Sequence, residues 1–448
     1  MQSKRIAVIG TGITGLTAAF QLKKKGSELT VFEKNSEPGG AIKSVRSGKW
    51  LAEYGPNTLL LKDRVVAGFL SEVGLGKEIE EANPEASKRF IVRNGRLNSL
   101  PTSIRSAINT PLFSLQGKVR VLKEPFIRKS DHSDETVAGF VERRLGREML
   151  EYAINPFVAG IFASKPEELS LRHAFPAMYE MEQEYGSLIA AALFGSAKRK
   201  RLGRIPAKLI SFRTGLQQLP VRIAEGMDEI HYKTKIDKIE KRREGWIVKS
   251  AGAAYGPFRT VILNIPFYQQ KELLGQLNGV SDSFFKRVFY PPLSVVHLGY
   301  TKEQIAHPLD GFGFLVPEVE KRQILGGLFS STLFQDRAPE GHHLLTLFAG
   351  GGRQPEIAAR STEELVALME EELSELIGLK GSHQFMDHVY WPHAIPTYRT
   401  GYDAVLREFD RVEHAHPGLL IAGNFRYGIS LPDCIKNGLK LAEKLGEI

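Results

Sequence analysis

The pattern of hydrophobic positions near the N-terminus predicts a strand, a turn, a helix and a second strand, in that order. Residues 5–9 form a short apolar run, residues 10–15 are rich in glycine, and residues 16–25 repeat apolar positions at helical spacing. A second apolar run, residues 28–32, ends at Glu33. This order predicts a βαβ unit with a glycine turn between its first strand and its helix.

The rest of the chain divides into a helical middle and a strand-rich second half. Residues 93–206 carry helix-like runs, among them 135–144 and 147–154, which prolines interrupt, and this predicts an inserted helical unit. After Gly215 we predict strands at 230–239, 246–250, 260–265, 294–300, 324–330, 344–349 and 419–422. Helical patterns at 362–376 and 435–445 complete the prediction.

The composition is that of a folded globular chain. Of 448 residues, 25% are charged and 42% are hydrophobic, which excludes collagen-like and disordered classes. Cys434 is the single cysteine, so an intramolecular disulfide and a cysteine-rich metal site are excluded. No run reaches the roughly 18 to 20 apolar residues of a transmembrane helix, and no secretory signal is visible. We therefore expect a cytoplasmic location.

The net charge of +9 permits nucleic acid, anionic lipid or a polyanionic small molecule as partner. Residues 185–224 hold eight Lys and Arg and no Asp or Glu. Residues 185–197 are uncharged and too few to cross a bilayer, but the apolar run 188–194 beside the basic run 198–201 is typical of an interfacial anchor. A core helix followed by a solvated basic loop explains the pattern equally well.

Three glycines and one carboxylate in the N-terminal unit have the spacing of a nucleotide site. Gly10 makes the tight turn, Gly12 lets the backbone approach a pyrophosphate, and Gly15 lets the helix pack on the strand. The start of the helix then faces the phosphates. Glu33 stands where a carboxylate accepts hydrogen bonds from ribose hydroxyls and disfavours a 2′-phosphate. NAD and FAD remain alternatives at this point.

Further motifs extend the pattern beyond a nicotinamide site. Residues 38–41 read Pro-Gly-Gly-Ala and residues 53–57 read Glu-Tyr-Gly-Pro-Asn, two turn-forming clusters. With residues 211–220 and 422–424 they form an ordered series that resembles the FAD-dependent amine oxidase and porphyrinogen oxidase superfamily. Two positions depart from it, because Ala41 stands where the superfamily usually has Arg or Lys, and Pro432 and Asp433 stand where relatives commonly carry Gly.

Within that superfamily the chain resembles the oxygen-dependent protoporphyrinogen oxidase family over nearly its whole length. Segments 55–57, 155–160, 166–171, 311–317, 328–331, 336–339 and 394–398 carry the resemblance. It implies a mixed α/β fold with a Rossmann-like FAD-binding domain (1–84, 207–264 and 410–448) and a β-sheet substrate-binding domain (85–92 and 265–409). The third part is a helical insertion (93–206) that could associate with a membrane. A peripheral position of the protein on the cytoplasmic membrane face therefore stays open.

The resemblance also implies the residues of the two binding sites. FAD contacts are expected from Gly10, Gly12, Ile13, Thr14, Gly15, Glu33, Lys34, Gly40, Ala41, Gly55, Pro56, Asn57, Thr58, Ile236, Trp391, Gly423, Asn424, Ile429, Ser430 and Leu431. Substrate contacts are expected from Arg93, Phe157, Gly160, Phe312, Leu315, Leu328 and Phe348, with Arg93 on a propionate. Without the surrounding motifs, Leu315, Leu328 and Phe348 would be ordinary core residues and Arg93 a solvated turn residue.

The implied reaction is the six-electron oxidation of protoporphyrinogen IX in three flavin cycles, with O2 as acceptor and H2O2 as product. Coproporphyrinogen III oxidation is the nearest alternative, followed by an amine oxidase or desaturase and by a flavin-binding scaffold without turnover. A metal site is not expected, since His342 and His343 have no companion ligands at a recognisable spacing. A nucleic-acid partner is not expected either. A homodimer stays open, and no general base is assigned.

Overall fold

The computed structural model describes residues 5–132, 134–195 and 204–446. A parallel sheet forms the centre of its nucleotide-binding half, in the order β10 (Ile230–His231), β2 (Leu29–Phe32), β1 (Ile6–Ile9), β14 (Thr260–Leu263) and β20 (Leu419–Ile421). β1 is apolar and buried at every position, as expected for a strand covered on both faces. The predicted βαβ unit and the mixed α/β class are confirmed.

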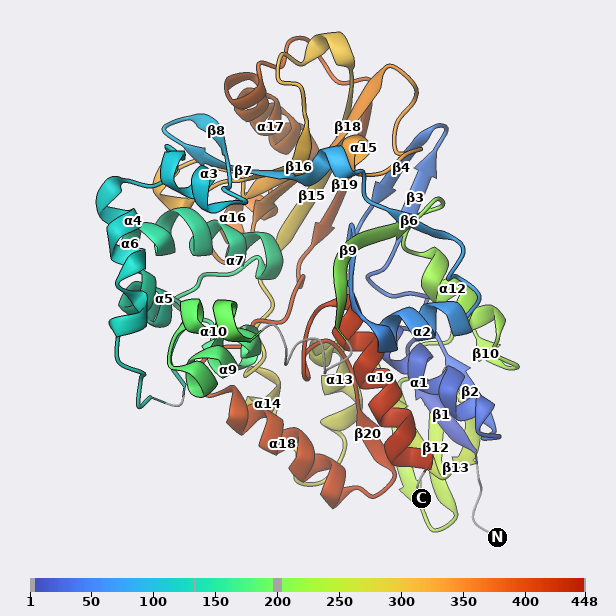
Figure 1. The fold of residues 1–448 in the computed structure, drawn as a ribbon. Helices are drawn as coiled ribbons and strands as arrows, with labels where there is room; N and C mark the ends of the chain where they lie inside the picture. Colours follow the sequence, from blue (N-terminus) through green and yellow to red (C-terminus); the bar gives the residue numbers. More distant parts are fainter. Residues whose placement is uncertain (1–4, 133, 196–203, 447–448) are drawn as a thin grey trace.

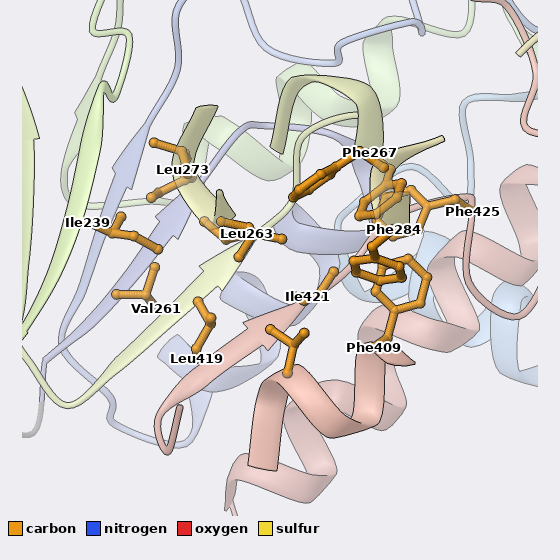
Figure 2. Close-up of a cluster of buried hydrophobic side chains, with 14 of the residues drawn as sticks. Ile239, Val261, Leu263, Phe267, Leu273, Phe284, Phe409, Leu419, Ile421 and Phe425 are labelled. Atoms are coloured by element: carbon orange, nitrogen blue, oxygen red, sulfur yellow. The ribbon is translucent and has the colours of Figure 1, made fainter. Parts of the chain in front are cut away.

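Helices cover one face of this sheet and a second, antiparallel sheet covers the other. α1 (Ile13–Lys24) and α19 (Leu431–Gly446) pack side by side on the first face (Figure 1). The second face holds β11 (Lys238–Arg242), β12 (Gly245–Ser250) and β13 (Ala253–Phe258), with α13 (Phe267–Leu274), α14 (Asp282–Phe285) and α18 (Tyr402–Ala415). Figure 2 shows the core between them, in which the rings of Phe267, Phe284, Phe409 and Phe425 gather beside Leu263 and Ile421.

A seven-stranded sheet forms the other half of the molecule (Figure 1). Its order is β19 (Phe385–Trp391), β15 (Leu293–Thr301), β18 (His342–Gly350), β17 (Gly326–Phe329), β16 (Gly311–Leu315), β7 (Lys88–Arg93) and β8 (Arg96–Ser99). α17 (Thr362–Ile377) covers one face. A capping box of Ser361 and Glu364 starts α17, and Gly378 in the left-handed region ends it, so its predicted bounds were nearly correct.

Short elements connect the two halves. One pair of strands is β3 (Ser44–Ser47) and β4 (Trp50–Glu53), and a small sheet orders β5 (Leu59–Asp63), β9 (Arg204–Phe212) and β6 (Ile79–Glu81). The helices nearby are α2 (Arg64–Glu72), α12 (Gln218–Glu225), α15 (Ser330–Leu333) and α16 (Pro355–Ala358), and the 3-10 turns are η1 (Pro84–Ser87), η4 (Lys302–Gln304) and η5 (Glu318–Glu320).

The predicted helical unit between the halves is present. It contains α3 (Ile104–Asn109), α4 (Leu115–Leu122), η2 (Glu124–Phe126), α5 (Val137–Leu145), α6 (Arg147–Met149), η3 (Leu150–Ile154), α7 (Asn155–Phe162), α8 (Leu171–Ala174), α9 (Pro176–Tyr185) and α10 (Leu188–Phe194). Arg144 is fully buried at its centre and pairs with Glu124 (2.5 Å) and Glu182 (2.6 Å). β8 pairs with β7, so residues 96–99 lie in the seven-stranded sheet; the division into three domains stays a prediction.

Two predicted elements were wrong in their extent. The strand predicted at 230–239 is two separate strands, because Lys233 has a φ of +52° and residues 233 and 234 donate their backbone N–H groups to Asn35 and Glu33. The strand expected near Ile236 is therefore absent at that residue, which lies buried between β10 and β11. α19 begins at Leu431 rather than at residue 435, since a proline such as Pro432 is tolerated in the first turn of a helix.

Candidate active site

The glycine turn after β1 is shaped by one side chain from a distant strand. Asn264 directly follows β14, and its amide nitrogen donates to the carbonyls of Gly10 (3.1 Å) and Gly12 (2.8 Å). A Cβ on Gly10 would lie 2.5 Å from the Asn264 carbonyl oxygen, and a Cβ on Gly15 would lie 2.4 Å from its amide nitrogen. Gly15 was expected to bring helix and strand together, and its missing Cβ lets α1 approach Asn264 at the end of β14.

The first turn of α1 presents backbone N–H groups at this edge of the sheet. Gly12 is the N-cap, and no side chain of the described residues caps the helix. A Cβ added at Gly40 would meet only the Gly12 Cα, 3.9 Å away, so the two glycine turns lie within van der Waals distance of each other, and Gly40 is exposed. Backbone N–H groups at a helix start without a side-chain cap fit a pyrophosphate.

Glu33 lies at the carboxyl end of β2 and is buried. Its Oε2 accepts hydrogen bonds from the Thr11 backbone N–H (2.9 Å) and hydroxyl (2.5 Å), and its Oε1 accepts one from the Asn35 backbone N–H (2.8 Å). Because a carboxylate oxygen has two lone pairs, Oε1 keeps the capacity for a further donor. The carboxylate thus fits a ribose hydroxyl beside the glycine turn.

The turn between β4 and β5 contains the predicted residues Gly55, Pro56, Asn57 and Thr58, and it contacts both halves of the molecule. A Cβ on Gly55 would lie 2.0 Å from the Ala41 carbonyl oxygen, so this position requires glycine. The Trp391 indole nitrogen, at the end of β19, donates to the Tyr54 carbonyl (2.9 Å). The predicted contact Trp391 is thereby held beside the turn.

The segment after β20 reaches the same edge of the parallel sheet. It carries Gly423, Asn424, Ile429 and Ser430 and enters α19 at Leu431. Leu431 and Ile13 share one buried cluster, and α1 and α19 approach closely enough that a Cβ on Gly438 would lie 2.5 Å from the Thr14 carbonyl oxygen. Ligands of open parallel sheets bind at the carboxyl ends of the strands, where these segments converge.

Comparison with known proteins identifies the family. The sequence profile of the family described as flavin containing amine oxidoreductase matches residues 13–445. The chain belongs to this family. As a flavin containing amine oxidoreductase it is an FAD-dependent oxidoreductase, and the groups described above fit the nucleotide half of FAD.

Relatives of this flavin containing amine oxidoreductase match it over nearly its whole length. It is 34% identical to protoporphyrinogen oxidase 2, chloroplastic/mitochondrial, of Arabidopsis thaliana, over 99% of this chain and 94% of the relative. It is 27% identical to coproporphyrinogen III oxidase of Staphylococcus aureus over 99% of both chains. A solved structure from Exiguobacterium has the same fold, with a TM-score of 0.85, 23% identity and coverage of 100% of this chain and 99% of that one.

Two predicted FAD contacts lie at the margin of the site. The Lys34 ammonium donates to the Gln269 side chain (3.1 Å) at the surface. Ile236 packs in the buried cluster that includes Phe32 of β2. Their contacts with FAD stay predictions.

An apolar row crosses the face of the seven-stranded sheet that α17 leaves uncovered. Register pairs Val389 with Val295, Val295 with Phe348, Phe348 with Gly326, and Gly326 with Leu315, so these side chains point to one face. α7 lies against this row, since a Cβ on Gly160 would lie 2.8 Å from Leu315 Cδ2. The structure thus brings together the predicted residues Leu315, Phe348 and Gly160.

A polar row runs beside the apolar one on the same face. Register pairs Asp387 with His297 and His297 with Thr346. Thr346 in turn pairs with the predicted residue Leu328, which ends this row. His297 is fully buried, its Nδ1 lies 3.0 Å from the Thr346 hydroxyl, and burial lowers its pKa to about 3. The Tyr54 hydroxyl donates to Asp387 (3.1 Å), and its ring stacks on the His297 ring with centroids 6.2 Å apart. This network joins the turn after β4 to the sheet.

The other predicted substrate residues lie apart from the apolar row. Arg93 Nη1 donates to Glu148 (2.7 Å) and to the Leu112 carbonyl, and the guanidinium lies over the Tyr152 ring. Phe157 is exposed and packs on Phe175, while Phe312 and Leu328 contact the cluster of Leu333 and Phe334. A substrate role for these residues stays a prediction.

Sequence reasoning missed Asn264, Tyr54 and His297. Asn264 had a usable signal, because a polar residue directly after a buried strand lies at the edge where ligands bind. Tyr54 belongs to the motif at residues 53–57, from which only Gly55, Pro56 and Asn57 were predicted as contacts. In the part of the chain that the structure describes, no three His, Cys, Asp or Glu side chains are placed to hold a metal ion. Within the same residues, no helix is long and apolar enough to cross a membrane.

Proposed function

We propose that this chain oxidises a porphyrinogen in heme biosynthesis, with protoporphyrinogen IX as the first substrate. The observation that carries the proposal is the match to the plant protoporphyrinogen oxidase, which extends over 99% of the chain. The apolar row on the seven-stranded sheet supports it, because a flat macrocycle needs an apolar wall. Gly160 and Gly326 permit close packing beside this wall, since a Cβ at Gly160 would lie 2.8 Å from Leu315 Cδ2 and a Cβ at Gly326 would lie 2.3 Å from the Phe314 carbonyl oxygen.

The chain's own residues bind and orient the ring. Leu315 and Phe348 supply apolar contacts, and Arg93 supplies a cation for a propionate. Both side-chain hydrogen bonds of Arg93 use Nη1, and no hydrogen bond from Nε or Nη2 to a described residue is present, although the guanidinium also lies over the Tyr152 ring. A guanidinium has five donors, and the unused ones can bind a carboxylate while the pair with Glu148 holds the side chain in place.

Bound FAD supplies the electron acceptor, which takes up two electrons in each of three cycles. O2 as the final acceptor and H2O2 as the product are part of the proposal. The polar row, with His297 held neutral by burial, stabilises the turn that carries Gly55 to Asn57 rather than serving as a charged group toward the substrate.

Coproporphyrinogen III is the second candidate substrate, because the relatives named coproporphyrinogen III oxidase in Staphylococcus aureus and Bacillus subtilis also match over 97% or more of the chain. Their identities of 27% and 26% lie below the 34% of the plant relative. The four propionates of coproporphyrinogen III require more cations at the rim of the binding site than the two propionates of protoporphyrinogen IX require.

Turnover of both porphyrinogens by the purified FAD-loaded protein tests the proposal. Porphyrin fluorescence reports oxidation, and a peroxide assay in the same sample reports the acceptor. We expect a higher kcat/KM for protoporphyrinogen IX and three peroxides per porphyrin. A higher kcat/KM for coproporphyrinogen III would reverse the choice of substrate, and no oxidation of either would refute the function.

We also propose a peripheral position on the cytoplasmic membrane face, through an apolar surface of the insertion. The surface consists of Ile108, Leu115, Val119, Leu122, Phe126, Leu193 and Phe194, which are all exposed. η2 contacts both α4 and α10, so three of the elements that carry these residues lie together. Exposed Lys123, Arg128 and Lys129 adjoin Phe126 in the chain and favour anionic lipid. The predicted basic run 198–201 lies outside the described residues.

Flotation with anionic vesicles at low and high salt tests this position. We expect the parent protein to float at low salt and Phe126→Asp to float less. Val65→Asp is the matched control, because Val65 is also exposed but lies on α2, outside the insertion. Equal flotation of all three proteins, or none by the parent, would contradict the proposal. Whether a homodimer forms stays a prediction.

A further inference from the structure

The loop that joins β20 to α19 has an unfavourable backbone for its sequence. Tyr427 has a φ of +66°, a left-handed conformation that costs a non-glycine residue free energy, and Gly423 and Gly428 have φ values of +148° and +124°. Tyr427 is 59% exposed, and its ring centroid lies 5.4 Å from Arg426 Cζ. Other contacts must therefore hold residues 423–430 in place.

Two buried tyrosine hydroxyls supply such contacts. The Tyr398 hydroxyl donates to the Asn424 carbonyl (2.5 Å) and accepts from the Gly428 backbone N–H (2.9 Å), so it bridges both ends of the turn. The Tyr402 hydroxyl donates to the Phe425 carbonyl (2.7 Å). Both side chains are 2% exposed, and their ring centroids lie 4.7 Å apart.

Tyr398 is itself fixed from two sides. Its carbonyl accepts from the Ser170 backbone N–H of the insertion (2.8 Å), and the neighbouring Thr397 donates its backbone N–H to the Phe289 carbonyl (2.8 Å). On the other side of the loop, the Phe425 ring points into the aromatic cluster of Figure 2, with centroids 5.4 Å from Phe267 and 5.2 Å from Phe409. The position of the Tyr398 hydroxyl is thus determined by the surrounding structure.

We propose that Tyr398 is a positioning residue for the flavin cofactor: its hydroxyl fixes the 423–430 loop and the start of α19 against the cofactor. The inference rests on the FAD site described above. This loop leaves the carboxyl edge of the parallel sheet beside the glycine turn and leads directly into α19, which packs on α1. A shift of the loop therefore moves backbone groups that face the cofactor.

Tyr398→Phe tests the inference, because it removes one oxygen and keeps the buried ring. The Gly428 N–H and the Asn424 carbonyl then lose their partner. We expect the dissociation constant of FAD, measured by titration of the apoprotein, to rise about 5- to 30-fold. The visible circular dichroism of the bound flavin should change as well, since it depends on the groups around the ring.

Tyr300→Phe is the matched control. Tyr300 is a fully buried tyrosine of β15, and its hydroxyl donates to Glu370 (3.2 Å) on the side of the sheet that α17 covers. Both variants should lose similar thermal stability, but only Tyr398→Phe should bind FAD more weakly. Unchanged FAD affinity and flavin dichroism in Tyr398→Phe would overturn the inference and leave a purely structural role.

Tyr402→Phe keeps the inference testable if Tyr398→Phe does not fold. It removes a single hydrogen bond to the same loop, so a smaller loss of FAD affinity is expected and no loss would count against the inference. FAD affinity and dichroism do not require a porphyrinogen. A parent protein that binds FAD but oxidises no porphyrinogen would therefore refute the proposed function and leave this test intact.

Discussion

Replacing Glu53 by glutamine should change how stability depends on pH. Glu53 ends β4 and is 4% exposed; its carboxyl group accepts from the Ser44 hydroxyl (2.6 Å) and from the Leu216 backbone N–H (2.8 Å). Burial raises its pKa from 4.5 to about 7, against the opposing effects of these hydrogen bonds and of Arg337, which lines the same small cavity. In the folded protein the carboxyl group is therefore protonated in mildly acidic solution.

The magnitude follows from the two pKa values. A difference of about 2.5 pH units corresponds to about 3 kcal/mol between the charged and neutral forms. Because the pKa is raised in the folded state, the stabilisation is complete below pH 4.5 and is lost as the pH rises through about 7. Glu53→Gln has no carboxyl group to ionise, so this position costs the variant no stability as the pH rises.

Urea unfolding of both proteins at several pH values between about 5 and 8 measures the effect. As the pH rises, the difference between the unfolding free energies of the variant and the parent should increase by about 2 to 3 kcal/mol in favour of the variant. His297 acts with the opposite sign, since its pKa is lowered from 6.5 to about 3 and its stabilisation is lost as the pH falls. It is present in both proteins and cancels in the difference. A difference that does not vary with pH would refute the reasoning.

Three further outcomes follow from the described contacts. Glu33→Ala should weaken FAD binding by about 1.5 to 3 kcal/mol, measured by titration of the apoprotein, because it removes a charged acceptor beside the glycine turn; unchanged affinity would contradict the ribose contact. Arg93→Ala should lower kcat/KM for porphyrinogen about 10- to 150-fold, mainly through KM, and Arg93→Lys should recover part of this loss. Glu148→Gln breaks the same ion pair and should lower kcat/KM less. Equal losses of kcat/KM in Arg93→Ala and Glu148→Gln would assign Arg93 a structural role. Arg144→Met should cost about 3 to 5 kcal/mol of unfolding free energy, because buried Glu124 loses its ion-pair partner and buried Glu182 keeps only Arg143. A loss below about 1 kcal/mol would contradict this.

The parts of the fold that could be predicted from sequence are those set by local patterns. The N-terminal strand and helix, α17 with its capping box, and the strands around 294–300 and 344–349 carry apolar spacing that tertiary contacts did not override. The strand predicted at 230–239 failed because two backbone N–H groups bond to residues 33 and 35 instead of extending a strand. Apolar spacing along the chain contains no information about such a partner.

The candidate site shows the same limit. The glycines were found because their spacing is local. Asn264, whose position leaves no room for a Cβ at Gly10 or Gly15, lies about 250 residues away in the sequence. The partner of Arg93 was also hidden, since Glu148 belongs to a different helix and nothing in either segment indicates the pair. Register across three strands, which places Leu315 and Phe348 on one face, becomes visible only in the folded sheet.

The order of strands in the parallel sheet has a consequence for synthesis on the ribosome. β1 is made first but lies between β2 and β14, and the sheet is complete only with β20 at residues 419–421. The insertion, whose buried ion pairs join residues 124, 144 and 182, can form from its own segment long before that. The nascent chain therefore carries an apolar strand without one of its neighbours until residue 263 has emerged, and an unpaired strand edge of this kind is prone to aggregate during that interval.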